Sequence, residues 1–125
     1  MQLDVLQENL NHALALVSRV IITKPQIPIL ANILLVAQEG KLTLTASNLE
    51  TSIAVDLGAK IISPGDFTVP GRTLSEIINS LFAEKVSLQV SAGSLDIKSG
   101  VFQARVNGVS AKEYPALSFA FTSDF

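Results

Sequence analysis

The sequence predicts an α+β fold made of two similar halves, each with a strand, a helix and three further strands. Apolar residues recur at three- and four-residue steps in two short segments, as expected for amphipathic helices. Runs of alternating apolar and polar residues, bounded by Gly- and Asn-containing turns, indicate strands. The same order of elements occurs before and after the Ser63–Asp66 loop. With 125 residues, 48% of them hydrophobic, the chain suffices for one compact domain and not for two.

The first half begins with a predicted strand, Gln2–Leu6, and a helix follows it. An apolar stripe indicates this helix, formed by Leu6, Leu10, Ala13, Leu14, Val17 and Ile21. The proline-containing loop Lys24–Pro28 ends the helix. Turn residues at Glu39-Gly40 and Ser47-Asn48 then separate three predicted strands. These strands are Ile29–Ala37, Lys41–Ala46 and Thr51–Leu57.

The second half begins with the predicted strand Phe67–Pro70, and a second helix follows. One side of this helix is apolar, with Leu74, Ile77, Ile78 and Leu81. Thr73 and Glu76 have the spacing of a capping box, in which each side chain accepts a hydrogen bond from a free backbone amide. Turns at Ala92-Gly93 and Ser99-Gly100 separate three more predicted strands. These are Lys85–Val90, Ser94–Lys98 and Val101–Asn107.

Each half is expected to form a small sheet with one amphipathic helix, and neither could bury its apolar face alone. Packing the halves side by side would place both helices on one face of antiparallel sheets and leave the other face open. An unrelated α+β domain with accidental internal symmetry is the alternative. Residues 1–118 are expected to form the domain. Residues 119–125, with Phe119, Phe121 and Phe125, are expected to begin a linker or the first strand of a following domain, although a tail folded onto the core is an alternative.

Composition argues against several classes of protein. The chain has no cysteine, one histidine and no metal-ligand spacing, so we expect no metal and no cofactor. A Gly-x-Ser-x-Gly elbow and a Gly-rich phosphate loop are both absent, which argues against an enzyme. The most apolar run, Ile29–Ala37, is about half the ~20 residues that cross a bilayer, so we expect no membrane contact and a cytoplasmic protein. The formal net charge of −2 gives no support for nucleic-acid binding.

Four motifs, in order and at matching distances, resemble one known family. They are Lys24–Leu35, Ser47–Glu50, Thr68–Arg72 and Glu113–Pro115. Together they resemble the N-terminal domain of the bacterial DNA polymerase III beta subunit, the beta sliding clamp. The resemblance implies a DNA-clamp fold and a processivity factor whose subunits each contain three such domains. Two subunits would join head-to-tail into a ring around duplex DNA, without sequence specificity, and tether the replicative polymerase. The polymerase III core and the clamp loader would bind the later domains, which lie outside this chain.

Helical geometry places a mixed set of side chains on the faces that would line the ring. Glu8, His12, Ala15 and Arg19 fall opposite the apolar stripe of the first helix, and Arg72, Glu76 and Asn79 opposite that of the second. The candidate DNA contacts are Lys24, Arg72, Arg19, Asn79 and His12. The resemblance supports Lys24 and Arg72, while Arg19 and His12 depend on geometry and Asn79 could reach phosphates through water. Lys24 could equally serve as a cation at a helix C-terminus, and His12 could be merely solvated.

The last predicted strand, Val101–Asn107, corresponds to the family's sheet edge that pairs with another subunit. The candidate interface residues are Phe102, Ala104, Arg105, Val106 and Thr73. Relatives carry a bulky aromatic residue and a leucine in place of Ala104 and Val106, and a basic residue in place of Thr73. The smaller apolar area and the missing charge predict a weaker contact. The alternative function is a non-catalytic interaction scaffold that oligomerises through this edge strand without contacting DNA.

Overall fold

The computed structural model describes residues 1–21 and 27–115 of the chain. These residues form two α-helices and three short 3-10 helices: α1 Gln7–Val17, α2 Gly71–Asn79, η1 Ser18–Val20, η2 Pro28–Ala31 and η3 Ala111–Glu113. The strands are β1 Gln2–Leu6, β2 Asn32–Gln38, β3 Lys41–Ser47, β4 Ser52–Gly58, β5 Lys60–Ser63, β6 Gly65–Pro70, β7 Lys85–Ser91, β8 Ser94–Ser99 and β9 Phe102–Asn107. The predicted α+β class and the repeated strand-helix-strand-strand-strand order are confirmed. We call β1, α1 and β2–β4 the first unit, and β6, α2 and β7–β9 the second unit.

The strands form two antiparallel sheets that do not coincide with the two units. One sheet has the order β5-β1-β7-β8-β9 and the other has the order β4-β3-β2-β6. The first strand of each unit therefore lies in the sheet that holds the last three strands of the other unit, with β1 beside β7 and β6 beside β2. The expectation that each half makes its own sheet was wrong in this respect. Exchange of the first strands joins the two units through backbone hydrogen bonds.

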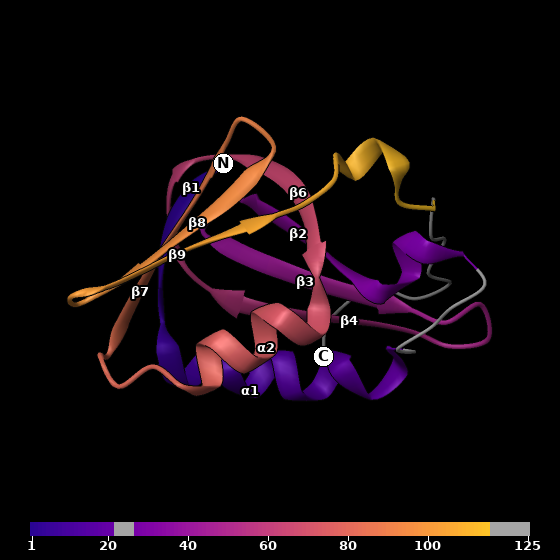
Figure 1. Cartoon of the computed structure of the whole chain (residues 1–125), viewed down its shortest axis with the longest axis horizontal. Helices are drawn as coiled ribbons and strands as arrows, with labels where there is room; N and C mark the ends of the chain where they lie inside the picture. The colour runs from indigo at the N-terminus through magenta and orange to yellow at the C-terminus, as the bar shows by residue number, and fades with distance from the viewer. Residues whose placement is uncertain (22–26, 116–125) are drawn as a thin grey trace.

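The two helices lie side by side and run in opposite directions along one side of the domain (Figure 1). They pack mainly on the four-stranded sheet, α1 against β3 and β4 and α2 against β2 and β6. A single buried cluster joins their apolar stripes to side chains of both sheets, including Leu10, Leu14, Leu74 and Ile78. Gly71, the first residue of α2, is buried, and a β-carbon there would lie 2.8 Å from Ile33 Cγ1. A residue without a side chain thus allows α2 to begin close to β2.

Two of the corners that join the sheets are marked by Gly58 and Gly108. After Gly58, the chain leaves the four-stranded sheet at β4 and enters the five-stranded sheet as β5. After Gly108, Val109 forms an isolated bridge with Thr68 of β6, so the end of β9 is tied to the other sheet. The following segment then covers part of the outer face of the four-stranded sheet, where Thr45, Ser47 and Thr68 are buried. This outer face is therefore less open than the repeated pattern predicted.

Three local predictions were wrong, each for a physical reason. Strand β5 was missed because Gly58 and Ala59 mark a change of sheet inside what looked like one strand and its loop. The strand predicted from Ile29 begins only at Asn32, because Pro28 starts a 3-10 turn that includes Ile29. The capping box is absent: α2 begins at Gly71 with Pro70 at the N-cap, so Thr73 is already helical and caps nothing.

The predicted hairpin turns are confirmed and repeat between the units. In the β2–β3 turn, Glu39 has φ 52 and Gly40 has φ 76, and in the β7–β8 turn, Ala92 has φ 49 and Gly93 has φ 80. Two consecutive positive φ values are the signature of a type I′ turn, whose twist matches that of the flanking strands. The Ser47-Asn48 turn is also confirmed, since Asn48 Oδ1 accepts from the Thr51 amide at 2.8 Å.

Within the described ranges, 1–21 and 27–115, no helix is long and apolar enough to cross a membrane. The same residues contain no group of three side chains suited to holding a metal ion. Residues 119–125, predicted to begin a linker or another domain, lie outside the described part of the chain.

Candidate nucleic-acid interface

The first helix presents its predicted face to solvent. Its apolar stripe, with Leu10, Leu14 and Val17, has no exposed surface and faces the core. The opposite side is exposed and consists of Glu8, His12 and Ala15, with Arg19 following in η1. These four side chains thus lie on the surface where the helical pattern placed them.

The second helix behaves in the same way. Leu74 and Ile78 are fully buried, whereas Arg72, Glu76 and Asn79 are exposed. Glu76 accepts a hydrogen bond from Arg72 Nε at 3.2 Å, and both side chains are about two-thirds exposed. Such an exposed pair stabilises a protein by only about 0–1 kcal/mol. Arg72 can therefore exchange Glu76 for another anion at little cost.

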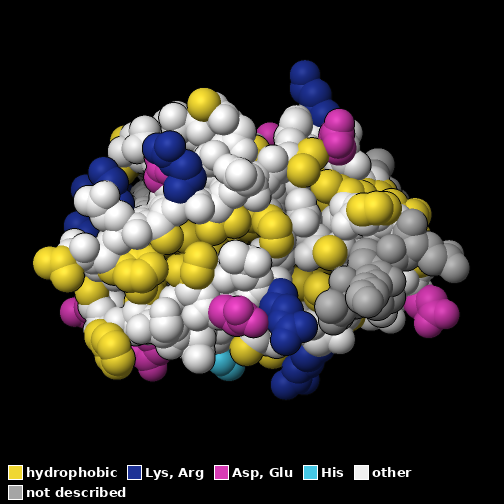
Figure 2. Space-filling model, viewed as in Figure 1, with side chains coloured by type: hydrophobic (Ala, Val, Ile, Leu, Met, Phe, Trp, Pro, Cys, Tyr) yellow, Lys and Arg dark blue, Asp and Glu magenta, His cyan; other side chains and the backbone are white. Residues whose placement is uncertain are grey.

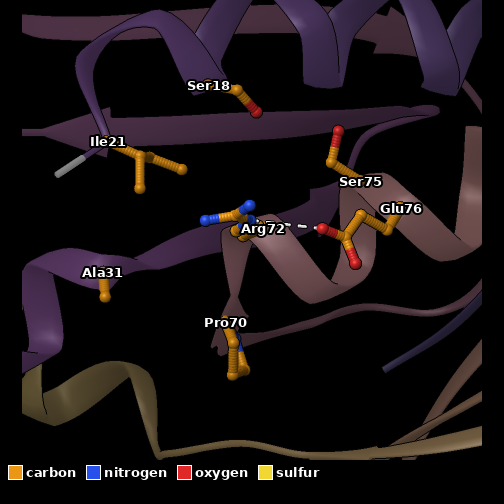
Figure 3. Close-up of a pocket in the computed structure, with 7 residues that line it drawn as sticks. All are labelled: Ser18, Ile21, Ala31, Pro70, Arg72, Ser75 and Glu76. Atoms are coloured by element: carbon orange, nitrogen blue, oxygen red, sulfur yellow. Dashed lines mark hydrogen bonds and ion pairs between the residues drawn. The ribbon is translucent and has the colours of Figure 1, made fainter. Parts of the chain in front are cut away.

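The antiparallel helices bring the end of α1 close to the start of α2. Ser18 and Ile21, on either side of Arg19 in the chain, share a hollow of about 300 Å³ with Arg72 and Glu76 (Figure 3). Arg19 and Arg72 therefore belong to the same end of the helix pair. Lys24, the third predicted cation of this region, lies outside the described residues.

The other two candidates lie elsewhere on the helices. Asn79 Oδ1 accepts a hydrogen bond from Asn11 Nδ2 at 3.3 Å, which places it where the end of α2 meets the start of α1. The Ile78 carbonyl oxygen accepts another bond from Gln7 Nε2 at 2.8 Å at the same place. His12 instead borders a hollow of about 400 Å³ between α1 and β4. The four predicted contacts that the structure describes thus do not form one compact cluster.

The side chains over the helices carry both signs of charge. Figure 2 shows Lys or Arg, acidic residues and the single histidine near one another along the lower side of the molecule. No dense cationic stripe follows the helices, so phosphate contacts would contribute modest, salt-sensitive affinity. These side chains also do not lie on a projecting helix or β-ribbon of the kind that enters a groove and reads base edges. The surface is suited to loose contact with a nucleic-acid backbone rather than to recognition of a sequence.

The predicted interface strand, β9, is an edge strand, since among the described strands it pairs only with β8. Phe102, Ala104 and Val106 lie on its core-facing side, with Phe102 37% exposed and Val106 6% exposed. A partner strand could therefore contact the Phe102 side chain but would meet the backbone of Val106. On the outer side, Arg105 Nε donates to Asp96 Oδ1 at 2.8 Å, and this contact raises the pKa of Arg105. Thr73, the fifth candidate, is exposed on α2.

Two apolar side chains beside this edge were missed in the sequence. Phe82, between α2 and β7, and Val101, in the β8–β9 turn, are fully exposed. The two turns adjoin, because a β-carbon at Gly100 would lie 3.5 Å from Ala83 Cβ. Hydrophobic side chains accordingly gather beside β9 at the left of Figure 2. The available signal was an isolated phenylalanine in a predicted loop.

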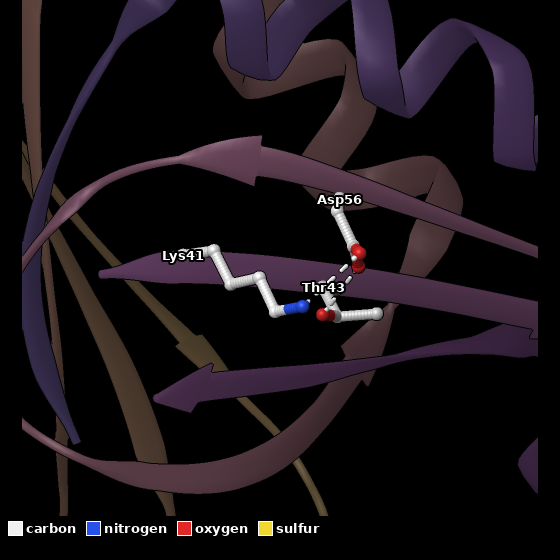
Figure 4. Close-up of polar contacts among 3 residues, drawn as sticks. All are labelled: Lys41, Thr43 and Asp56. Carbon is white, nitrogen blue, oxygen red and sulfur yellow. Dashed lines mark hydrogen bonds and ion pairs between the residues drawn. The ribbon is translucent and has the colours of Figure 1, made fainter. Parts of the chain in front are cut away.

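The edge strand β4 of the four-stranded sheet carries a polar network in place of exposed apolar groups. Asp56 of the edge strand β4 accepts from Thr43 Oγ1 at 2.6 Å and pairs with Lys41 Nζ at 3.4 Å (Figure 4). These contacts hold β4 to its neighbour β3 through side chains as well as through the backbone. The charge of Asp56 also lies in the middle of the strand, where it disfavours addition of an apolar strand.

Comparisons with known proteins agree with this geometry. The family model for "DNA polymerase III beta subunit, N-terminal domain" matches residues 1–118. The chain is 38% identical to the beta sliding clamp of Synechococcus elongatus and 34% identical to that of Synechocystis. Each match covers 94% of this chain and 32% of the relative. The chain thus spans about a third of the curated relatives that it matches.

Solved structures show the same fold. The Bacillus subtilis sliding clamp superimposes with a TM-score of 0.92 at 26% identity, over 95% of this chain and 34% of that one. The Caulobacter crescentus clamp gives 0.91 at 33% identity, over 96% of this chain and 33% of that one. Sliding clamps are non-catalytic proteins of DNA replication. The chain belongs to the bacterial beta sliding clamp family and corresponds to its N-terminal domain.

Proposed function

We propose that this domain forms one arc of a ring that encircles duplex DNA and tethers the replicative polymerase to its template. In this ring α1 and α2 face the hole and β9 pairs with an edge strand of another subunit. Residues 1–118 act as the clamp's N-terminal domain, residues 119–125 lead toward the next domain, and the protein works in the cytoplasm. The polymerase core and the clamp loader bind other domains of the assembled clamp.

The observation that carries this proposal is the common orientation of the helices. Their polar faces are exposed on the same side of the domain, and the exposed groups include Arg19, Arg72 and Asn79. The weak charge of this face supports sliding, because each firm phosphate contact would add affinity that has to be broken at every step. A ring is retained by topology and does not need that affinity. Lys24, which follows the end of α1 in the chain, would add a further cation to these contacts.

A chimeric clamp tests the proposal. Residues 1–118 would replace the corresponding domain of the Synechococcus elongatus clamp, and the chimera would be loaded onto nicked circular DNA by that organism's clamp loader. We expect retention on the circle and release when the DNA is linearised, as for the unmodified clamp. A folded chimera that stays bound after linearisation, or that is never retained, would contradict the topological mechanism.

The alternative is a non-catalytic scaffold that oligomerises through β9 and does not contact DNA. The open edge of β9 and the apolar side chains beside it favour oligomerisation through this strand. The same assay separates the two functions. A scaffold predicts a chimera that assembles normally and gives no DNA retention that depends on a closed circle.

A further inference from the structure

We propose that Asn107 is a modification site, where the chain deamidates spontaneously, and that the corner between β9 and β6 controls the rate of this reaction. Asn107 is the last residue of β9 and the only asparagine of the chain that glycine follows. Glycine has no β-carbon to crowd its backbone nitrogen, so this nitrogen can reach the preceding side chain. The reaction needs only water, so it depends neither on DNA nor on other subunits, and therefore not on the proposed function.

Deamidation replaces the side-chain amide of asparagine by a carboxylate. The Gly108 nitrogen attacks Asn107 Cγ, and the bond between Cγ and Nδ2 breaks. The proton of the Gly108 amide leaves with Nδ2 as ammonia, and a succinimide ring remains. Water then opens the ring at either of its carbonyl groups. The product is aspartate or isoaspartate, and in isoaspartate the main chain runs through Cβ and Cγ and is longer by one carbon.

In the folded domain the β7–β8 turn holds both reacting groups. Gly108 N donates to the Gly93 carbonyl oxygen at 3.1 Å, and Asn107 Oδ1 accepts from Ser94 Oγ at 3.0 Å. Asn107 is exposed, so water reaches its side chain. The Gly108 amide, however, has to leave Gly93 before its nitrogen can attack. The reaction should therefore proceed through local opening of the corner and be slow while the corner is closed.

The fold requires glycine at this position, although glycine makes the preceding asparagine reactive. A β-carbon at Gly108 would collide with the Thr68 carbonyl oxygen and the Phe67 ring. The next residue closes the corner: Val109 N donates to the Thr68 carbonyl oxygen at 2.9 Å, and the Val109 carbonyl oxygen accepts from Thr68 N and Thr68 Oγ1. An extra main-chain carbon before Gly108 would move Val109 away from these partners. Isoaspartate at position 107 should thus loosen the tie between β9 and the other sheet.

Peptide mapping by mass spectrometry of the chain, kept at mildly alkaline pH, tests the site. We expect the mass increase of deamidation at Asn107 before any other asparagine, with aspartate and isoaspartate as products. The internal controls are Asn48, whose Oδ1 accepts from two backbone amides, and Asn79, which serine follows. Asn107→Gln should prevent the modification, because a glutamine side chain would have to close a larger ring. Deamidation at Asn107 that is no faster than at Asn79 would overturn the proposal.

The variant Thr68→Val tests control by the corner. It removes the hydroxyl that donates to the Val109 carbonyl oxygen at 2.9 Å, so the corner should open more often and Asn107 should deamidate about two- to ten-fold faster. Thr68→Ser keeps the hydroxyl and should react at close to the wild-type rate. The matched control is Thr43→Val, which removes a hydroxyl bonded to Asp56 in the same sheet.

Urea separates local opening from an effect on the chemistry itself. In urea that unfolds the domain, the wild-type chain and all three threonine variants should deamidate at one common rate, about ten-fold or more above that of the folded wild-type chain. Equal rates with and without urea would show that the fold does not protect Asn107. Equal acceleration by Thr68→Val and Thr43→Val would show that the reaction follows global unfolding. Either result would overturn control by the corner.

Ageing should weaken the wild-type domain and spare the blocked variant. The isoaspartate-containing fraction of an aged wild-type sample should unfold at a lower urea concentration than the fresh chain. Asn107→Gln, aged in the same way, should unfold as it did when fresh. An isoaspartate fraction as stable as the fresh chain would show that the modification leaves the corner intact, and would overturn its predicted consequence.

Discussion

The two repeated units share their order of elements and the geometry of their hairpin turns, but their last strands lie in different surroundings. In the first unit α1 packs along β4, and Leu57 is buried in the core. In the second unit α2 packs against β6, β2 and η1 and makes few contacts with β9. Phe102 stays partly exposed and Val101 fully exposed. A duplicated fold can thus keep its backbone plan while one copy of a strand is sealed and the other remains available for a partner.

The two corner glycines give the largest expected effect. A β-carbon at Gly108 would collide with the Thr68 carbonyl oxygen and the Phe67 ring, whereas one at Gly58 would meet nothing within 4 Å. Gly108→Ala should therefore destabilise the domain by about 3 kcal/mol or more, because it separates the end of β9 from β6. Gly58→Ala should change stability by no more than about 0.5 kcal/mol. Urea unfolding measures both, and equal effects would show that the two corners are not anchored differently.

Tyr114 belongs to the segment that covers the outer face of the four-stranded sheet. Its contribution to stability should become visible at high pH. Burial raises the pKa of Tyr114, partly offset by the Ser47 backbone, although the hydroxyl has no well-formed hydrogen bond. A raised pKa in the folded state means that the stabilisation is complete below the unfolded tyrosine's pKa and is lost as pH rises above it. The wild-type domain should thus lose stability above about pH 10, and Tyr114→Phe should lose less.

Tyr114 is the only tyrosine of the chain, and the chain contains no tryptophan. Ultraviolet absorbance of the phenolate therefore reports this one group directly during a pH titration. At neutral pH, Tyr114→Phe should be nearly neutral, because it removes a buried hydroxyl that lacks a partner. Titration of the native-state phenol at its ordinary pKa would contradict the burial argument.

The hairpin turns should respond equally in the two units. Glu39 and Ala92 both have the positive φ that asparagine adopts more readily than other non-glycine residues. Glu39→Asn and Ala92→Asn should each stabilise the domain by about 0.5 kcal/mol, measured by urea unfolding. The control Ser91→Asn, at the last residue of β7, should give no such gain. Unequal gains would show that the repeat does not extend to the energetics of its turns.

Substitution of the exposed Arg19, which follows α1, and Arg72, in the first turn of α2, should have the smallest effect on stability. Arg19→Ala and Arg72→Ala should each change the unfolding free energy by less than about 0.5 kcal/mol. In the chimeric clamp, each should lower the salt dependence of binding to a short duplex by about one unit of slope. An unchanged slope for one of them would exclude that arginine from the phosphate contacts. Glu8→Ala, on the same face of α1, serves as the control for a change of surface charge.

The sequence predicted most of the secondary structure because its signals are local. Alternation of Leu42 and Leu44 with threonines, and the stripe through Leu10 and Leu14, each follow from one element's own geometry. The exchange of β1 and β6 between the sheets leaves no such signal, because both strands look alike in either sheet. Strand β5 was missed for a related reason: its pairing with β1 is long-range, and the nearby Gly58 and Pro64 suggested a loop.

The candidate site was predicted less completely than the fold. Exposure of Arg19, Arg72, Asn79 and His12 followed from helical periodicity. Their relative positions did not, because these depend on the antiparallel packing of α1 against α2. His12 instead borders the hollow between α1 and β4. The capping box failed because Pro70 and Gly71 start the helix three residues earlier than the motif requires.

The exchange of first strands has a consequence for how the domain came to hold together. Each unit's last three strands need the first strand of the other unit beside them: β6 beside β2, and β1 beside β7. A unit on its own would therefore leave that position in its sheet empty. Two separate chains that traded strands in this way would form a domain-swapped dimer. The present chain has the organisation of such a dimer, with β5 connecting its two units. We therefore expect that neither unit stays folded alone and that the domain unfolds in one cooperative step.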